Sequence, residues 1–300
     1  MATPAAGSAG LALKIPTTAG AAISVAREAE ILREMHGLGL GPIEETIPRY
    51  VECRQLDGRH VLVSTAMSGV PMSVGYHRWP HTARRPAVAE DYSLALSWLT
   101  VFQEESVCGE RQLRWGTEVV EAMSQRWHGH ADLDEALQHV GPAAERLGLL
   151  DVVQTAVHGD FWFGNILVDE GRVSGVIDWE SGAACGEPLA DVARFVLSYS
   201  LYLDRHTRAG RRVLGHPGLR RSTNGAGISY GLLGSGWYPQ LVRTELTRSL
   251  RRLGLPATRW YDMALVGIAE VAATGGDDTF AAEHLTLLAS LPPYPRPVGT

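Results

Sequence analysis

The chain has 300 residues, of which 45% are apolar and 20% charged, as expected for a globular protein with a sizeable core. Its formal net charge of −6 excludes a generally basic protein that coats nucleic acid or anionic lipid by charge alone. No apolar run approaches the roughly 20 residues that span a bilayer, and the first residues do not resemble a secretory signal. We therefore expect a cytoplasmic protein with no membrane partner and no nucleic-acid partner.

The cysteines suggest the redox environment. Cys53, Cys108 and Cys185 are odd in number and far apart, and they show no metal-ligand spacing. We expect no disulfide framework, which is typical of a protein in a reducing compartment.

The basic residues are unevenly chosen, because 26 are arginines and only Lys14 is a lysine. A compact, strongly hydrated ammonium differs physically from a planar guanidinium. We therefore expect Lys14 to have a role that arginine cannot fill.

The first part of the chain is predicted to be small and rich in β-structure. Strands are predicted at residues 11–15, 51–56 and 60–65, the last two joined by a turn at Asp57-Gly58. Residues 26–35 show the periodicity of an amphipathic helix, and Glu28 lies on its apolar stripe. An unpaired carboxylate in such a place is costly.

Beyond a linker near residue 68 the chain is predicted to be mostly helical, with a β interlude at residues 157–180. Helices are predicted at residues 89–105, 114–127, 131–147, 188–204, 228–235, 238–253 and 259–273. This pattern predicts one domain of residues 1–67 and another of residues 68–300.

The β interlude contains a predicted hairpin that brings polar side chains together. With Gly171-Arg172 as a two-residue type II′ turn, Asn165 lies opposite Asp178. Directly opposed residues of an antiparallel pair share one face, with Cα atoms about 4.5–5.5 Å apart. Asp160 lies in a short loop five residues before Asn165 and can fold over the same end.

Amide and carboxylate oxygens of this kind are the ligands that Mg²⁺ prefers, with water and phosphate completing its coordination. A second carboxylate can orient a hydroxyl group and accept its proton. Taken singly, Asp160, Asn165 and Asp178 are also ordinary turn and loop residues. Their combined spacing beside His158-Gly159 favours a catalytic site.

The stretch from His158 to Glu180 is the most specific motif in the chain. It reads His-Gly-Asp, four further residues, Asn-Ile-Leu-Val and then Val-Ile-Asp-Trp-Glu. This pattern resembles the aminoglycoside phosphotransferase family, whose relatives include choline and homoserine kinases. The resemblance runs from about Lys14 to Phe195. It implies an α+β, bilobal protein-kinase-like fold with a small β-rich N-lobe and a larger, mainly helical C-lobe.

The resemblance implies a role for each residue of the motif. Asp160 is expected to be the catalytic base or to orient the acceptor hydroxyl, and His158 to brace the loop that carries it. Asn165 and Asp178 are expected to bind Mg²⁺. The expected reaction moves the γ-phosphate of ATP or GTP to a hydroxyl group of a small molecule.

Nucleotide binding is expected in the N-terminal part. The resemblance makes Lys14 the lysine that reaches the α and β phosphates, and Glu28 its partner on the helix. Thr65, Ala66 and Met67 correspond to the interlobe hinge, where backbone groups hold adenine. The lone lysine and the glutamate on an apolar helix face are thus the two residues that the family would pair.

The main departure from the family lies before Lys14, because only 13 residues precede it where the family normally has two strands and a glycine-containing loop. We therefore expect a truncated N-lobe, a longer polypeptide that supplies the strands, or another part of the protein that covers the phosphates. Two further functions stay open. One is a kinase of another small alcohol, such as choline, a sugar or homoserine. The other is a catalytically impaired nucleotide-binding module.

Charged clusters leave the acceptor open. Six arginines between residues 205 and 221 favour a solvated loop; if they lined the acceptor side, they would favour an anionic acceptor over a polycationic aminoglycoside. An anionic acceptor pocket has its own candidates, which are Glu180, Glu187, Asp191, Asp277 and Asp278.

Overall fold

The computed structural model describes residues 10–56, 59–222 and 224–293, so the predicted turn at Asp57-Gly58 lies outside the described residues. The chain forms two compact units. Unit 1 comprises Met1–Arg78, Glu90–Gly109 and Gln154–Asp191. Unit 2 comprises Trp79–Ala89, Glu110–Val153 and Val192–Thr300. The predicted division into domains of residues 1–67 and 68–300 stays a prediction.

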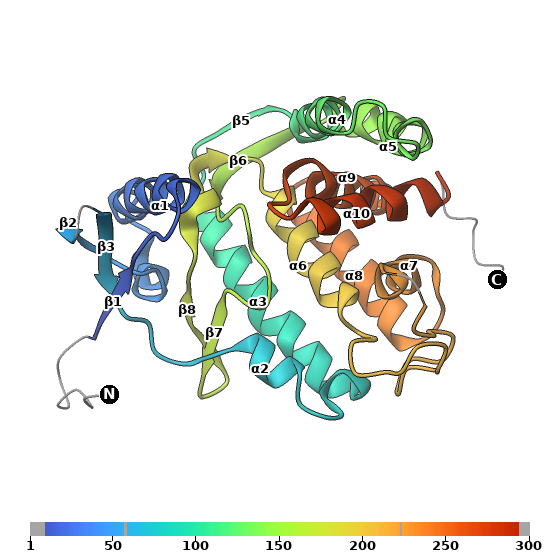
Figure 1. Ribbon diagram of the computed structural model, residues 1–300, viewed down its shortest axis with the longest axis horizontal. Coiled ribbons are helices and arrows are strands. Elements are labelled where there is room, and N and C mark those ends of the chain that lie inside the picture. Colours follow the sequence, from blue (N-terminus) through green and yellow to red (C-terminus); the bar gives the residue numbers. More distant parts are fainter. Residues whose placement is uncertain (1–9, 57–58, 223, 294–300) are drawn as a thin grey trace. The chain divides into compact units, whose positions relative to one another are not determined.

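Unit 1 opens with an antiparallel sheet of strand order β1-β3-β2 (Figure 1). Its strands are β1 (Leu11–Lys14), β2 (Tyr50–Leu56) and β3 (Arg59–Thr65). Helix α1 (Ala19–Gly37) packs on β2 and β3 and buries Ile31 and Met35. It begins seven residues before the predicted start because Thr18 caps it, accepting a hydrogen bond from the Ala21 N–H at 3.1 Å.

The second sheet has the order β4-β7-β8 and contains the predicted hairpin. Its strands are β4 (Val70–Pro71), β7 (Ile166–Asp169) and β8 (Arg172–Val176). The turn is at Glu170-Gly171 and not at Gly171-Arg172, because both central residues have the positive φ that a type I′ turn requires. The ladder is shifted and has an irregularity between Leu167 and Val168, and the Ile177 N–H donates to the Asn165 carbonyl at 3.0 Å. The predicted pairing of Asn165 with Asp178 is therefore wrong.

The third sheet has the order β5-β6-β9. Its strands are β5 (Gly109–Gln112), β6 (Asp151–Val157) and β9 (Ala183–Gly186), and the preceding helices are α2 (Met72–Tyr76) and α3 (Arg85–Glu105). In the chain, β5 and β6 come before the hairpin of the second sheet and β9 comes after it. Two aromatic residues of α3 support the loop after β6. Trp98 stacks on Phe161, and Phe102 meets Trp179 edge-on, each with ring centroids 5.5 Å apart. All four side chains are buried, and the contact of Trp98 with Phe161 anchors the loop on α3.

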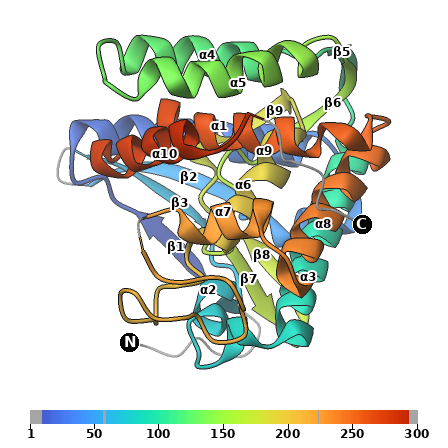
Figure 2. The same ribbon diagram turned by 90° about the vertical axis from the view of Figure 1, so that its right-hand side faces the viewer.

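Unit 2 is built from helices. They are α4 (Trp115–Arg126), α5 (Leu133–Leu147), α6 (Leu189–Leu201), α7 (Ala226–Leu233), α8 (Trp237–Arg252), α9 (Trp260–Thr274) and α10 (Asp278–Ser290). Helices α4, α5 and α10 all pack on α9, which is buried along most of its length (Figure 2). Within α9 the buried Asp262 accepts hydrogen bonds from Arg146 of α5. None of the helices in the described ranges is long and apolar enough to cross a bilayer.

The structure contains a disulfide that the sequence analysis did not expect. Cys108, whose N–H donates to the Gln154 carbonyl at 2.9 Å, is bonded to Cys185 of β9, 77 residues further along the chain. The expectation of no disulfide is wrong because the third sheet brings the two Cα atoms to 5.9 Å, which sequence spacing does not show. The expected absence of a disulfide was the reason for placing the protein in a reducing compartment, and the disulfide takes that reason away. Cys53 is free and exposed.

We predict that replacing Cys108 and Cys185 by serine lowers the free energy of unfolding by about 2–4 kcal/mol, because the disulfide restricts the unfolded chain. Urea unfolding measures this change, with Cys53→Ser as the matched control. Alkylation of the unfolded, unreduced protein should modify one cysteine, and three after reduction. Modification of all three before reduction would show that the bond is absent.

Candidate active site

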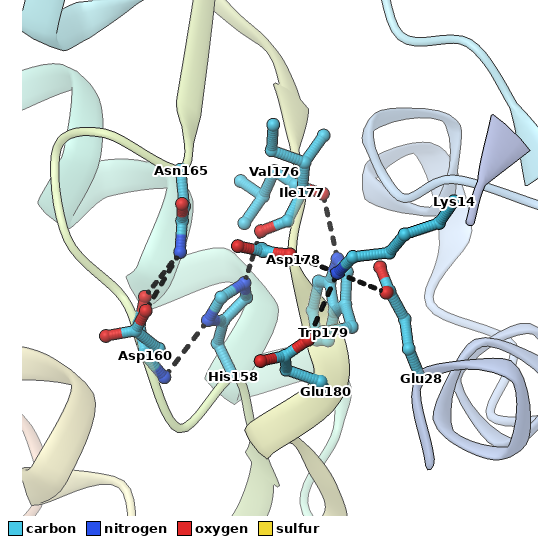
Figure 3. A network of polar contacts seen from close by, with 10 residues as sticks. All are labelled: Lys14, Glu28, His158, Asp160, Asn165, Val176, Ile177, Asp178, Trp179 and Glu180. Atoms are coloured by element: carbon cyan, nitrogen blue, oxygen red, sulfur yellow. Dashed lines mark hydrogen bonds and ion pairs between the residues drawn. The ribbon is translucent and has the colours of Figure 1, made fainter. Parts of the chain in front are cut away.

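Lys14 ends β1 and directs its ammonium group at three carboxylates of unit 1 (Figure 3). Nζ donates to Glu28 Oε2 at 2.6 Å, to Glu180 Oε2 at 3.1 Å, and to Asp178 Oδ1. Burial lowers the pKa of Lys14, but hydrogen bonds to Asp178 and Glu28 outweigh burial and raise the pKa above its usual value. The amine is therefore a fixed positive charge whose three donors each meet a different carboxylate.

Glu28 belongs to the buried face of α1, where 7% of its side chain is exposed. A carboxylate at such a place needs a cationic partner, and the fold provides the one lysine of the chain. The contact expected between Lys14 and Glu28 is thus present in the structure.

Glu180 is a partner of Lys14 that the sequence analysis did not identify, having considered it only for an acceptor pocket. Asp178 has a φ of 71°, so the chain turns sharply after β8 and enters the short 3₁₀ helix Trp179–Ser181. This turn directs both Asp178 and Glu180 at Lys14. The only sequence signal for this role of Glu180 is its position two residues after Asp178. That spacing places both carboxylates near Lys14 only when Asp178 has the left-handed conformation, which the sequence does not reveal.

Asp160 and Asn165 face each other across the loop between β6 and β7. The Asn165 Nδ2 donates to the backbone carbonyl of Asp160 at 3.0 Å and to its carboxylate Oδ2 at 3.2 Å. These two bonds turn the amide nitrogen of Asn165 toward Asp160 and its oxygen away (Figure 3). Asn165 is 6% exposed, whereas Asp160 is half-buried.

His158 connects this loop to the segment that carries Asp178. Its Nε2 donates to the Ile177 carbonyl at 2.9 Å, while its Nδ1 accepts the N–H of Asp160 at 3.2 Å. The two partners fix the tautomer, because a carbonyl only accepts and an N–H only donates. The ring is fully buried against Trp179, with centroids 4.6 Å apart. This arrangement orients Asp160 and supports the bracing role expected for His158.

Asp191 is a supporting residue that the sequence analysis misassigned. Its carboxylate accepts the N–H of His158 at 2.7 Å and that of Gly159 at 2.8 Å, and it is completely buried. Burial raises the pKa of Asp191, while the two hydrogen bonds from the backbone N–H groups of His158 and Gly159 oppose the rise. The proposal that Asp191 lines an acceptor pocket is wrong, because no part of it reaches the surface.

Gly159 has a conformational reason to be glycine. Its φ is +77°, and a Cβ atom there would lie 2.1 Å from the carbonyl oxygen of Ser181. The His-Gly-Asp sequence therefore allows the loop to approach the segment after Asp178 closely.

Thr65, Ala66 and Met67 follow one another at the end of β3. The Ala66 N–H donates to the Gly10 carbonyl at 2.7 Å, and Met67 packs against Gly175 of β8. The segment is thus attached to both the first and the second sheet. Its role in holding adenine stays a prediction.

The donor atoms present fit a hard divalent cation. Oxygens of Glu28, Asp178 and Glu180 lie within 4.8 Å of one another, and Asp178 lies between Lys14 and Asn165 (Figure 3). The amide oxygen of Asn165 is turned away from Asp160 and is a neutral oxygen with no hydrogen bond to Asp160. Carboxylate and amide oxygens are the ligands typical of Mg²⁺.

The chain belongs to the phosphotransferase enzyme family, whose family model matches residues 4–222. Among solved structures, the aminoglycoside phosphotransferase APH(4)-Ia is similar with a TM-score of 0.57 at 15% identity, over 95% of this chain and 87% of that one. A ternary complex of its thermostable mutant with AMP-PNP and hygromycin B is similar with a TM-score of 0.55 at 15% identity, over 94% of this chain and 86% of that one.

A putative aminoglycoside phosphotransferase from Ralstonia eutropha JMP134 is similar with a TM-score of 0.51 at 15% identity, over 94% of each chain. No curated protein matches the sequence. At these identities the structures establish the fold alone. The family and the α+β kinase-like fold expected from the sequence are thereby confirmed.

We predict that Asp191→Ala lowers the free energy of unfolding by about 3 kcal/mol, because the buried N–H of His158 and the part-buried N–H of Gly159 lose their acceptor. Chemical denaturation measures the loss. Asp169→Ala, on the exposed end of the hairpin, is the matched control and should leave stability within about 0.5 kcal/mol. Equal effects of the two substitutions would show that Asp191 does not hold the loop.

Proposed function

We propose that this phosphotransferase moves the γ-phosphate of ATP or GTP to a hydroxyl group of a small molecule. The observation that carries the proposal is the convergence within unit 1 of a charged lysine, a buried glutamate, two aspartates and an asparagine. This set matches the division of labour in kinases, where positioning and charge neutralisation supply most of the catalysis.

On the donor side, Lys14 would bind phosphate oxygens. Its ammonium is held in place by Glu28, so its charge is already oriented before a nucleotide arrives. Phosphate oxygens of the nucleotide would replace one or both of the carboxylate oxygens of Asp178 and Glu180 that now accept hydrogen bonds from Lys14. Glu28 is the contact we expect to persist, because it is the most buried of the three carboxylates.

Asn165 and Asp178 would hold Mg²⁺, which when bound would neutralise phosphate charge. The Asp160–Asn165 hydrogen bond sets which atom of the Asn165 amide is offered to the ion. Two neighbours restrain Asp178, with Lys14 holding its carboxylate and His158 bonded to the preceding carbonyl.

On the acceptor side, Asp160 would accept a hydrogen bond from the substrate hydroxyl and take its proton as the phosphoryl group is transferred. Its position is fixed by the N–H bond to His158 and by Asn165. The fold relatives include an aminoglycoside phosphotransferase crystallised with hygromycin B and AMP-PNP, which supports a nucleotide donor and a small-molecule acceptor here.

We predict that Asp160→Ala lowers phosphate transfer by about a hundredfold to ten-thousandfold while nucleotide affinity changes little, since the carboxylate acts on the acceptor. ADP release over a panel of aminoglycosides, sugars and small alcohols measures transfer, and calorimetry measures nucleotide binding. Asp169→Ala is the control with the same chemical change. Unchanged turnover of Asp160→Ala on the best acceptor would refute the mechanism.

We also predict that Lys14→Arg lowers the rate of transfer by about a hundredfold, although the charge is kept. A planar guanidinium cannot place three donors on three convergent carboxylates as an ammonium does, and small misplacements at a reacting centre are costly. The reverse change at an exposed site, Arg54→Lys, is the control. Full activity of Lys14→Arg would mean that only the charge matters.

A further inference from the structure

Unit 2 carries a concentration of positive charge that the proposed reaction does not use. Two segments, residues 79–89 and 204–221, hold eight of the 26 arginines and one acidic residue, Asp204. We call these arginines the arginine surface: Arg84, Arg85, Arg205, Arg208, Arg211, Arg212, Arg220 and Arg221. Their segments have a formal charge of +7 in a chain whose net charge is −6. Every member is exposed.

The two segments are in direct contact. The Nε2 of the buried His216 donates to the Thr82 carbonyl at 2.7 Å. Gly215 lies so close to Ala83 that a Cβ atom on it would be 2.5 Å from the Ala83 Cα. The segments that carry these arginines therefore adjoin each other in unit 2.

The loop between α6 and α7 is folded, which the interpretation as a merely solvated loop did not predict (Figure 2). Arg212 and Arg220 form an antiparallel bridge, and the Gly210 N–H donates to the Arg221 carbonyl at 2.7 Å. Val213 and Leu219 are buried beneath the bridge. Arg221 braces the loop by donating to the Thr207 carbonyl at 2.6 Å. The remaining arginines are thus presented on a fixed support.

This arrangement is electrostatically unfavourable in isolation. Like charges opposite each other on paired strands destabilise the pair, as Arg212 and Arg220 must. Arg85 begins α3, where the helix dipole disfavours a cation. Arg221 interacts with Asp204, but within the described ranges none of the eight arginines has a carboxylate at salt-bridge distance. An external anion would relieve this repulsion.

Two large apolar side chains of the same segments are also exposed. Trp79 is 72% exposed and Leu214 is 50% exposed. Leu214 precedes Gly215, which contacts Ala83, and Trp79 lies four residues before Ala83 in the other segment. Tryptophan is characteristic of membrane–water interfaces, and leucine inserts among lipid chains.

We propose that the arginine surface docks this protein on an anionic phospholipid membrane, with Trp79 and Leu214 entering the interface. Each arginine near such a surface contributes about 1 kcal/mol, and an apolar residue adds to the binding. A polynucleotide would match the arginines but would leave Leu214 exposed to water. A lipid surface accounts for both the charge and the apolar side chains. This proposal is independent of the phosphotransfer reaction, and it departs from the expectation of no membrane partner that the net charge suggested.

The test is co-sedimentation of the purified chain with vesicles of phosphatidylcholine containing 30% phosphatidylglycerol, compared with vesicles of phosphatidylcholine alone. We expect binding to the anionic vesicles that weakens as salt is raised, and little binding to the neutral ones. Arg211→Gln/Arg212→Gln should weaken binding by about 30-fold, as two charges are lost. Leu214→Ser should weaken it by about tenfold.

The control is Arg54→Gln/Arg251→Gln, which removes two exposed charges outside these segments and should leave binding unchanged. Thermal melting shows whether a loss of binding comes from unfolding. Arg211→Gln/Arg212→Gln should not have a lower melting temperature, because it removes one of the two like charges that face each other at the Arg212–Arg220 bridge. Three results would each overturn the proposal: equal binding to both kinds of vesicle, equal losses in the test and control variants, or binding of a single-stranded oligonucleotide without binding of vesicles.

Discussion

The ion pairs of Lys14 are the interaction on which the candidate site depends. A single ammonium joins β1, α1 and the segment after β8, which are separated by up to 166 residues in the chain. Each carboxylate would be unfavourable beside the other two without the cation, and the cation would be unfavourable in a half-buried place without them. Their positions are therefore determined together. The same geometry suits phosphate binding, since phosphate oxygens can replace carboxylate oxygens around a charge already in place.

The loop after β6 depends on a second set of interactions, made by groups that take no part in chemistry. Asp191 holds two backbone N–H groups of the loop, and His158 ties it to Ile177. The buried rings of Phe161 and Trp179 complete the support. Asp160 is thus exposed enough to meet a substrate while its backbone is fixed, which is the arrangement that catalysis by positioning requires.

The sequence predicted the fold where local signals were strong. The β1–β3 region, most helices and the His158–Glu180 motif were recognisable, because periodicity and residue type act within a few positions. The turn was misplaced by one residue, since Glu170 adopts a positive φ that its residue type does not suggest. Helix α10 was missed, although Asp277 caps it in the ordinary way, accepting from the Phe280 N–H at 2.7 Å.

Long-range contacts were the part that the sequence could not supply without the family pattern. Nothing in the local sequence relates Cys108 to Cys185, or Asp191 to the N–H groups of His158 and Gly159. Glu28 was the exception, because a carboxylate on an apolar stripe itself demands a partner and the chain contains one lysine. Unusual residues in unfavourable places were therefore more informative than common residues in favourable ones.

The most direct test of the central claim uses the fact that Lys14 is the only lysine. Protein labelled with ¹⁵N-lysine has one side-chain ammonium signal, which reports on Lys14 without assignment. Addition of ATP with Mg²⁺ should move this signal, and the shift should be altered in Glu28→Gln, where the buried partner is lost. A signal that stays in place while calorimetry shows the nucleotide to be bound would contradict the account.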